Sequence, residues 1–143
     1  MAVGDILENY GFQVFYTRTE DVYQRPYQQA IIANEIGGDL FVSIHRNSSP
    51  VPNQYTGVET LVYSNQGLPK RVAENINRQL EAVGYKNLGV EERPGLIVLN
   101  STQMPAVLVE AGFINSDIDN ALFDQRFQET AGAIAAGINE SFL

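Results

Sequence analysis

Short runs of apolar residues alternate along this chain with stretches in which apolar residues recur every three or four positions. Runs of about four to eight apolar and β-branched residues are typical of buried strands, and the longer recurrence is typical of amphipathic helices. The pattern predicts strands over residues 12–17, 40–44, 57–63, 96–99 and 106–109. It predicts helices over residues 3–10, 27–36, 68–83, 121–123 and 127–142. Polar segments at residues 18–26, 48–55 and 115–119 predict loops and turns.

The order of these elements predicts the fold class. Strands that alternate with helices are typical of an α/β domain, with helices on both faces of a mostly parallel or mixed sheet. A length of 143 residues suits one domain with a single core, so we expect residues 1–143 to form one three-layer α/β/α unit. The apolar content of 44% and the charged content of 18% are those of a folded globular protein.

Composition excludes several classes of partner. A net charge of −8 argues against nucleic-acid binding, because a duplex binder normally presents a basic face. No apolar run approaches the roughly 20 residues that a membrane-spanning helix needs. The first residues show no secretion signal, because no basic stretch precedes an apolar one. The absence of cysteine excludes disulfides and thiolate metal sites, so any metal ligands beyond the single histidine would be carboxylates.

Two of the predicted strands end in an ionisable residue. The strand over residues 40–44 runs into His45, the only histidine, and the strand over 106–109 runs into Glu110, which Gly112 follows closely. Open α/β sheets place their sites at the carboxyl ends of strands, so His45 and Glu110 are candidates for a common site. Each also has a purely structural interpretation, His45 as a half-buried residue closing a strand and Glu110 as a surface carboxylate.

Five short pieces in order carry a resemblance to a known family. They are Gly11-Phe12 with Thr17-Arg18, Ala33-Asn34, the run from Ser43 to Asn47, the run from Gly57 to Thr60, and the run from Pro105 to Phe113. Each piece alone is weak, but the succession resembles the zinc-dependent N-acetylmuramoyl-L-alanine amidases of the amidase-3 type, which are bacterial cell-wall hydrolases. With the closing helix, the resemblance covers essentially the whole chain.

The resemblance implies roles for individual residues. Family members bind zinc through two histidines and a glutamate, and a further glutamate serves in catalysis. The Ser-Ile-His motif implies that His45 is a zinc ligand, and the Val-Glu-x-Gly-Phe motif implies that Glu110 is the catalytic glutamate. Arg46 and Asn47 follow the ligand directly and are candidates for substrate binding or for orienting the ligand, and they could equally satisfy loop carbonyls. Glu59 lies within a predicted strand and faces either solvent or the cleft.

The chemistry explains why such residues are needed. Zinc lowers the pKa of its bound water to about 7, and three protein ligands leave the fourth position open for that water. A neighbouring carboxylate can accept the proton of the water and pass it to the leaving nitrogen.

The resemblance also implies that part of the family domain precedes this sequence. In the family the other two zinc ligands lie upstream, in a Gly-His-Gly-Gly turn after the first strand and in a glutamate that opens the first helix. This sequence begins after both, so we expect an N-terminally incomplete domain that binds zinc weakly or not at all. We expect the slot of the first strand, between residues 12–17 and 40–44, to close on itself, to be filled by strand exchange in an oligomer, or to hold an upstream piece.

The implied function is hydrolysis of the amide between N-acetylmuramic acid and L-alanine, with peptidoglycan as partner and an extracellular or cell-wall location. Two alternatives stay open. One is a non-catalytic wall-binding or regulatory module on the same fold, and the other is a metallopeptidase that acts elsewhere on the stem peptide.

Overall fold

The computed structural model describes residues 1–17 and 24–143 of the chain. Its helices are α1 (Ala2–Asn9), α2 (Pro26–Ile36), α3 (Gly67–Val83), α4 (Ile97–Asn100), α5 (Asp117–Gln125) and α6 (Phe127–Ser141). Its strands are β1 (Phe41–Asn47), β2 (Val58–Val62), β3 (Asn87–Glu92) and β4 (Ala106–Phe113). Positions 18–23 of the predicted loop at 18–26 lie outside the described residues.

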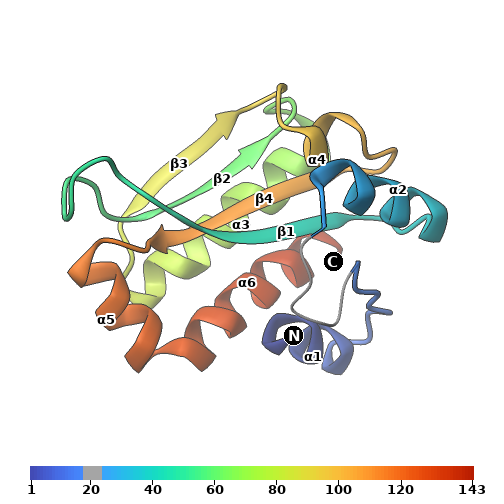
Figure 1. Cartoon of the computed structure of the whole chain (residues 1–143). Helices are drawn as coiled ribbons and strands as arrows, with labels where there is room; N and C mark the ends of the chain where they lie inside the picture. The colour runs from blue at the N-terminus through green and yellow to red at the C-terminus, as the bar shows by residue number, and fades with distance from the viewer. Residues whose placement is uncertain (18–23) are drawn as a thin grey trace.

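The described strands form one four-stranded sheet in the order β1-β4-β2-β3. β1 runs parallel to β4, β2 runs antiparallel to β4, and β3 runs parallel to β2. With helices on both sides, this mixed sheet confirms the predicted three-layer α/β class (Figure 1).

Helices α3 and α6 cover one face of the sheet, and α1 packs beside α6 (Figure 1). The main core lies under them, where Val72, Ile76 and Leu80 of α3 meet Val107 and Val109 of β4. The spacing by four places these α3 side chains on one helix face, and that face packs against β4.

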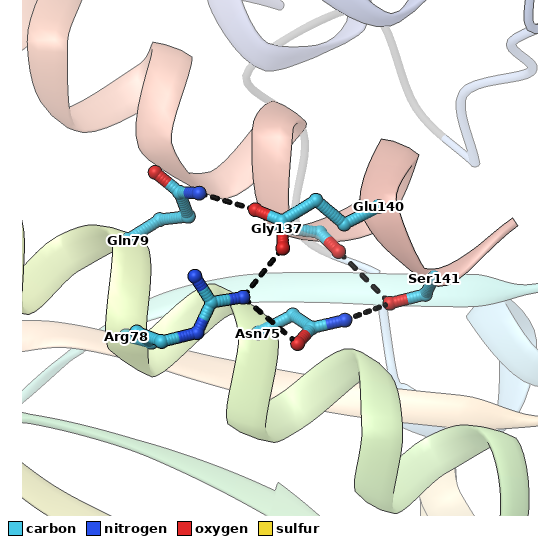
Figure 2. Close-up of polar contacts among 6 residues, drawn as sticks. All are labelled: Asn75, Arg78, Gln79, Gly137, Glu140 and Ser141. Carbon is cyan, nitrogen blue, oxygen red and sulfur yellow. Dashed lines mark hydrogen bonds and ion pairs between the residues drawn. The ribbon is translucent and has the colours of Figure 1, made fainter. Parts of the chain in front are cut away.

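The two helices α3 and α6 approach each other closely at Gly137. A Cβ atom there would lie 2.6 Å from the Cα atom of Ile76, so a larger residue would push the helices apart. Polar side chains flank this contact, as Figure 2 shows: Arg78 and Gln79 of α3 both donate hydrogen bonds to Glu140 of α6. These bonds link α3 to α6 beside the close contact at Gly137.

The other face of the sheet is covered at one end only. Helices α2 and α4 lie over a smaller core made by Phe41 of β1, Leu108 of β4 and Leu61 of β2 (Figure 1). Asn34 of α2 holds the segment after α4, because its amide donates to the Ser101 carbonyl and accepts from Gln103 N–H. The far end of this face, toward the carboxyl ends of β1 and β4, has no such helix over it among the described residues.

Two strand predictions are wrong. Residues 97–99 belong to the short helix α4 instead of a strand, and Leu96 is its N-cap residue. A four-residue apolar run does not distinguish the two structures, and Pro94-Gly95 turns the chain just before it. Residues 12–17 form no strand, because no described strand pairs with them. β3, in contrast, was not predicted, since exposed polar residues occupy both of its ends.

A groove separates residues 12–17 from the free edge of β1. It has a volume of about 620 Å³ and an apolar lining. The lining includes Val42 and Ile44 of β1, Leu7 of α1, Phe15, and Ile138 of α6. The two segments therefore do not close on each other, although the sequence offers that as one of three alternatives.

Candidate active site

His45, Glu110 and Glu59 form a row across three neighbouring strands. His45 of β1 is the register partner of Glu110 of β4, and Glu110 is in turn the partner of Glu59 of β2. Register partners project from the same face of a sheet, and this is the face that carries Phe41, Leu108 and Leu61. The row therefore lies at the uncovered end of that face, as the strand-end argument predicts for His45 and Glu110.

Glu110 combines partial burial with an incomplete set of hydrogen bonds. Its Oε2 atom is buried and has no hydrogen-bond partner among the described residues. Burial first, and then the charge of Glu59, raises the pKa of the Glu110 carboxyl, while Arg93 offsets part of this effect. A half-buried carboxylate with an unused buried oxygen is costly in free energy, and such costs are concentrated at functional sites.

Glu59 is the half-buried neighbour of Glu110. Its Oε1 atom accepts a hydrogen bond of 3.1 Å from the side-chain amide of Asn47. Burial and then Glu91 raise the pKa of the Glu59 carboxyl, whereas Arg93 and the bond from Asn47 lower it. Of the two orientations open to Glu59, toward solvent or toward the cleft, the structure shows the one that faces the candidate site.

His45 is exposed at the end of the row. Its Nε2 atom lies 2.8 Å from Ser43 Oγ, which precedes it by two positions on the same face of β1. Which atom donates depends on the tautomer of the imidazole. Ser43, which the sequence placed in the Ser-Ile-His motif without assigning it a role, thus orients the ring.

Arg46 and Asn47 lie on opposite sides of the strand that bears His45. The guanidinium of Arg46 lies 4.2 Å from the centre of the Phe123 ring and donates to the carbonyls of Ala111 and Phe113. The side chain of Asn47 reaches Glu59 and also accepts from the backbone N–H of Ser48. The structure therefore places Asn47 beside the row, and it places Arg46 against α5.

A buried carboxylate holds the strand ends that carry the site. Asp119 of α5 accepts from the backbone N–H groups of Gly57 and Phe113, which lie at the start of β2 and the end of β4. Gly112 has φ +82°, and a Cβ atom there would lie 3.0 Å from Asp119. Glycine is thus required for the close approach. In the sequence, Asp119 appears only as one of several polar residues in the predicted turn at 115–119. That pattern does not reveal which backbone groups its carboxylate would bind.

Comparison with known proteins places the chain. The model of the N-acetylmuramoyl-L-alanine amidase family (Amidase_3) matches residues 1–140. The chain belongs to this amidase family.

Individual members of the family agree with that placement. The chain is 34% identical over 141 residues to an endolysin of Bacillus phage SPP1, a match that covers 94% of this chain and 52% of the endolysin. It is 30% identical over 148 residues to the sporulation-specific N-acetylmuramoyl-L-alanine amidase of Bacillus subtilis (strain 168), covering 99% of this chain and 56% of that protein. The chain thus spans about half the length of these curated relatives.

Solved structures show the same fold. The catalytic domain of the amidase CwlV from Bacillus (Paenibacillus) polymyxa var. colistinus superimposes with a TM-score of 0.85 at 32% identity, covering 99% of this chain and 79% of that one. An amidase from Clostridium difficile 630 superimposes with a TM-score of 0.89 at 27% identity, covering 99% and 78%.

Amidases of this family generally depend on zinc, which needs a set of nitrogen, sulfur or carboxylate donors. The described residues contain no group of three or more His, Cys, Asp or Glu side chains that could hold a metal ion. His45 and the unpaired oxygen of Glu110 are suitable donor types, but structural and catalytic zinc sites use at least three protein ligands. The described residues therefore do not complete a zinc site by themselves.

Within the described ranges, no helix is both long and apolar enough to cross a bilayer.

Proposed function

We propose that this chain carries the catalytic face of an amidase that hydrolyses the bond between N-acetylmuramic acid and L-alanine in peptidoglycan. The observation that supports this most is the register of His45 with Glu110, whose buried Oε2 atom has no hydrogen-bond partner among the described residues. Membership of the amidase family supplies the substrate class.

Glu110 is the proposed general base. Desolvation and the neighbouring Glu59 raise the pKa of its carboxyl toward the range in which a base works best near neutral pH. In hydrolysis it accepts a proton from the attacking water and returns a proton to the leaving nitrogen of L-alanine. General acid–base catalysis of this kind contributes about a hundred- to ten-thousandfold in rate.

His45 is the proposed zinc ligand of this chain. His45 lies exposed at the end of β1, and the Ser43 hydroxyl beside Nε2 helps to orient the ring. The remaining ligands would come from outside the described residues.

Asn47 is the proposed residue of the substrate surface, and Arg46 is proposed to support the site from the other side of β1. Asn47 lies beside the row of ionisable groups, where it would contact the sugar or the peptide next to the scissile amide. Arg46 would act through the carbonyls of Ala111 and Phe113, since it holds the end of β4 that follows Glu110.

Digestion of purified peptidoglycan by the full product of the gene tests this function. Mass spectrometry is expected to show stem peptides with a free L-alanine amino group and glycan strands without peptide. Cleavage elsewhere in the stem would instead support the metallopeptidase. Binding to peptidoglycan without product, by protein that takes up no zinc when zinc is supplied, would support the non-catalytic module.

We further propose that the protein acts outside the cell at the wall, and that a strand fills the groove beside β1. The apolar lining and the free edge of β1 suit an added strand. In a strand-exchanged oligomer, a second copy provides that strand. Light scattering on the purified protein tests this, and a monodisperse monomer would rule out the strand-exchanged oligomer.

A further inference from the structure

We propose that Glu59 is a positioning residue: by accepting a hydrogen bond from Asn47 across β4, it fixes the strand end after His45 relative to Glu110. This inference rests on the proposed amidase function and deepens it, because it assigns a role in the same site to a third strand.

The first support is the path of the hydrogen bond. Asn47 belongs to β1 and Glu59 belongs to β2, and β4 lies between these strands in the sheet. The bond of 3.1 Å between their side chains must therefore pass over β4, on the face that carries Glu110. It links β1 directly to β2 across β4, with its Glu59 end at the level of Glu110 and its Asn47 end at the level of Phe113.

The second support is the irregular pairing of β1 at this point. The register between β1 and β4 shifts between His45 and Asn47, so the regular ladder is interrupted before Asn47 pairs with Phe113. Asn47 makes three hydrogen bonds at this irregular end of β1. Its carbonyl accepts from Ile114 N–H, its Oδ1 accepts from Ser48 N–H, and its amide donates to Glu59.

The third support is the cost of placing a glutamate at this position. Like charges directly opposite each other on neighbouring strands are destabilising, and Glu59 lies directly opposite Glu110. A neutral side chain at position 59 would allow the same strand pairing without this repulsion. Local arrangements that oppose stability are expected at functional sites, where the lost stability serves the chemistry.

Kinetics of variants of the full gene product on purified peptidoglycan test the inference. Glu59→Ala and Asn47→Ala each remove the bond, and each is expected to lower kcat about tenfold, because a misplaced group loses rate more than binding. KM should stay within about twofold in Glu59→Ala, whereas Asn47→Ala should also raise KM because Asn47 is proposed to contact substrate. The comparison between single and double variants is therefore made on kcat. The double variant is expected to be no worse than either single variant, since both remove the same bond. Glu59→Gln retains an acceptor oxygen and is expected to keep at least about half of the activity.

Glu91→Gln is the matched control. Glu91 is a carboxylate on the neighbouring strand β3 that pairs with Arg93 and makes no bond to Asn47, so its variant should retain wild-type kcat. Additive losses in the double variant, or a Glu59→Ala enzyme within twofold of wild type, would overturn the inference. So would a Glu59→Gln enzyme as slow as Glu59→Ala. If wild type is active, Glu110→Gln is inactive and the Glu59 variants are unaffected, the proposed function stands and only the positioning role fails.

A second measurement does not depend on activity. In ¹⁵N-edited NMR spectra, the side-chain amide signals of Asn47 are expected to move in Glu59→Ala and to stay near their wild-type positions in Glu59→Gln and Glu91→Gln. If the Asn47 side-chain signals do not move in Glu59→Ala, the bond is not formed in solution and the inference fails. This result does not depend on whether the protein cleaves substrate.

Discussion

Two halves of one sheet face, built from the same three strands, have opposite characters. At one end Phe41, Leu61 and Leu108 are buried beneath α2 and α4. At the other end, the same three strands carry His45, Glu59 and Glu110. Among the described residues, no helix lies above them. The strands are continuous across both halves, so the rigid apolar half holds the polar half in register. The comparison shows that the position of the site on the sheet is set by where the covering helices α2 and α4 end.

The largest effect on stability is expected from the covered half. Leu108→Ala removes a side chain that is 7% exposed and leaves a cavity, so it should lower the free energy of unfolding by about 2–5 kcal/mol. Chemical denaturation at pH 7 measures this value. Leu88→Ala, on the exposed surface of β3, is the matched control, and it should cost less than about 1 kcal/mol. Equal losses for the two variants would mean that α2 and α4 do not seal the covered half.

The largest effect on activity is expected from the open half. Glu110→Gln preserves the shape of the side chain and removes the base, so turnover of peptidoglycan should fall at least about a hundredfold. Its stability should not fall, because the wild-type carboxyl has a buried oxygen without a partner among the described residues. Product release followed by mass spectrometry, together with a thermal melt, separates the two properties. Retention of more than about a tenth of the activity would contradict the role of Glu110 as base.

Zinc binding tests how complete the open half is. Because the described residues contain no group of three metal-binding side chains, the chain of residues 1–143 alone is expected to bind zinc weakly at neutral pH. Isothermal titration calorimetry measures the affinity, and His45→Ala should abolish whatever binding remains. One tight zinc ion per monomer would reveal ligands that the described residues do not show.

The sequence predicted the strands of both halves better than it predicted what covers them, since α4 was predicted as a strand. β1, β2 and β4 were recognised because each contains a short apolar run, and the convergence of His45 with Glu110 followed from strands ending at one edge. The pairing of Glu59 with Glu110 was not predictable, because β2 runs antiparallel beside β4 and only the folded sheet sets that register. Residues 12–17 have a strand-like composition, but a strand also needs a neighbour, which composition does not supply.

A smaller effect on stability is expected from Glu59, a carboxylate of the open half, and it should differ in sign from that of a surface carboxylate. Burial and Glu91 raise the pKa of the Glu59 carboxyl above its ordinary value, so ionisation costs more in the folded state than in the unfolded chain. The folded state is therefore penalised as pH rises from the ordinary carboxyl range through the raised pKa. Glu59→Gln should remove the penalty and increase stability at pH 7 by less than about 1 kcal/mol, with no gain at acid pH. Urea denaturation at several pH values measures the difference, and a gain independent of pH would contradict this electrostatic origin.

The smallest expected effect has the opposite sign and lies on the outer side of the α3–α6 pair (Figure 2). Hydrogen bonds from Arg78 and then Gln79 lower the pKa of the Glu140 carboxyl, so its ionised form is favoured in the folded state. That contribution is present above the ordinary carboxyl pKa and is lost as pH falls through the lowered value. Glu140→Gln should therefore decrease stability at pH 7 by less than about 1 kcal/mol, because exposed ion pairs contribute little. The difference from wild type should shrink as the urea denaturations are moved to acid pH and when salt is added. If Glu59→Gln and Glu140→Gln shifted stability in the same direction at pH 7, carboxylates on the open face would not differ from carboxylates on the surface, and the contrast between the two regions would not hold.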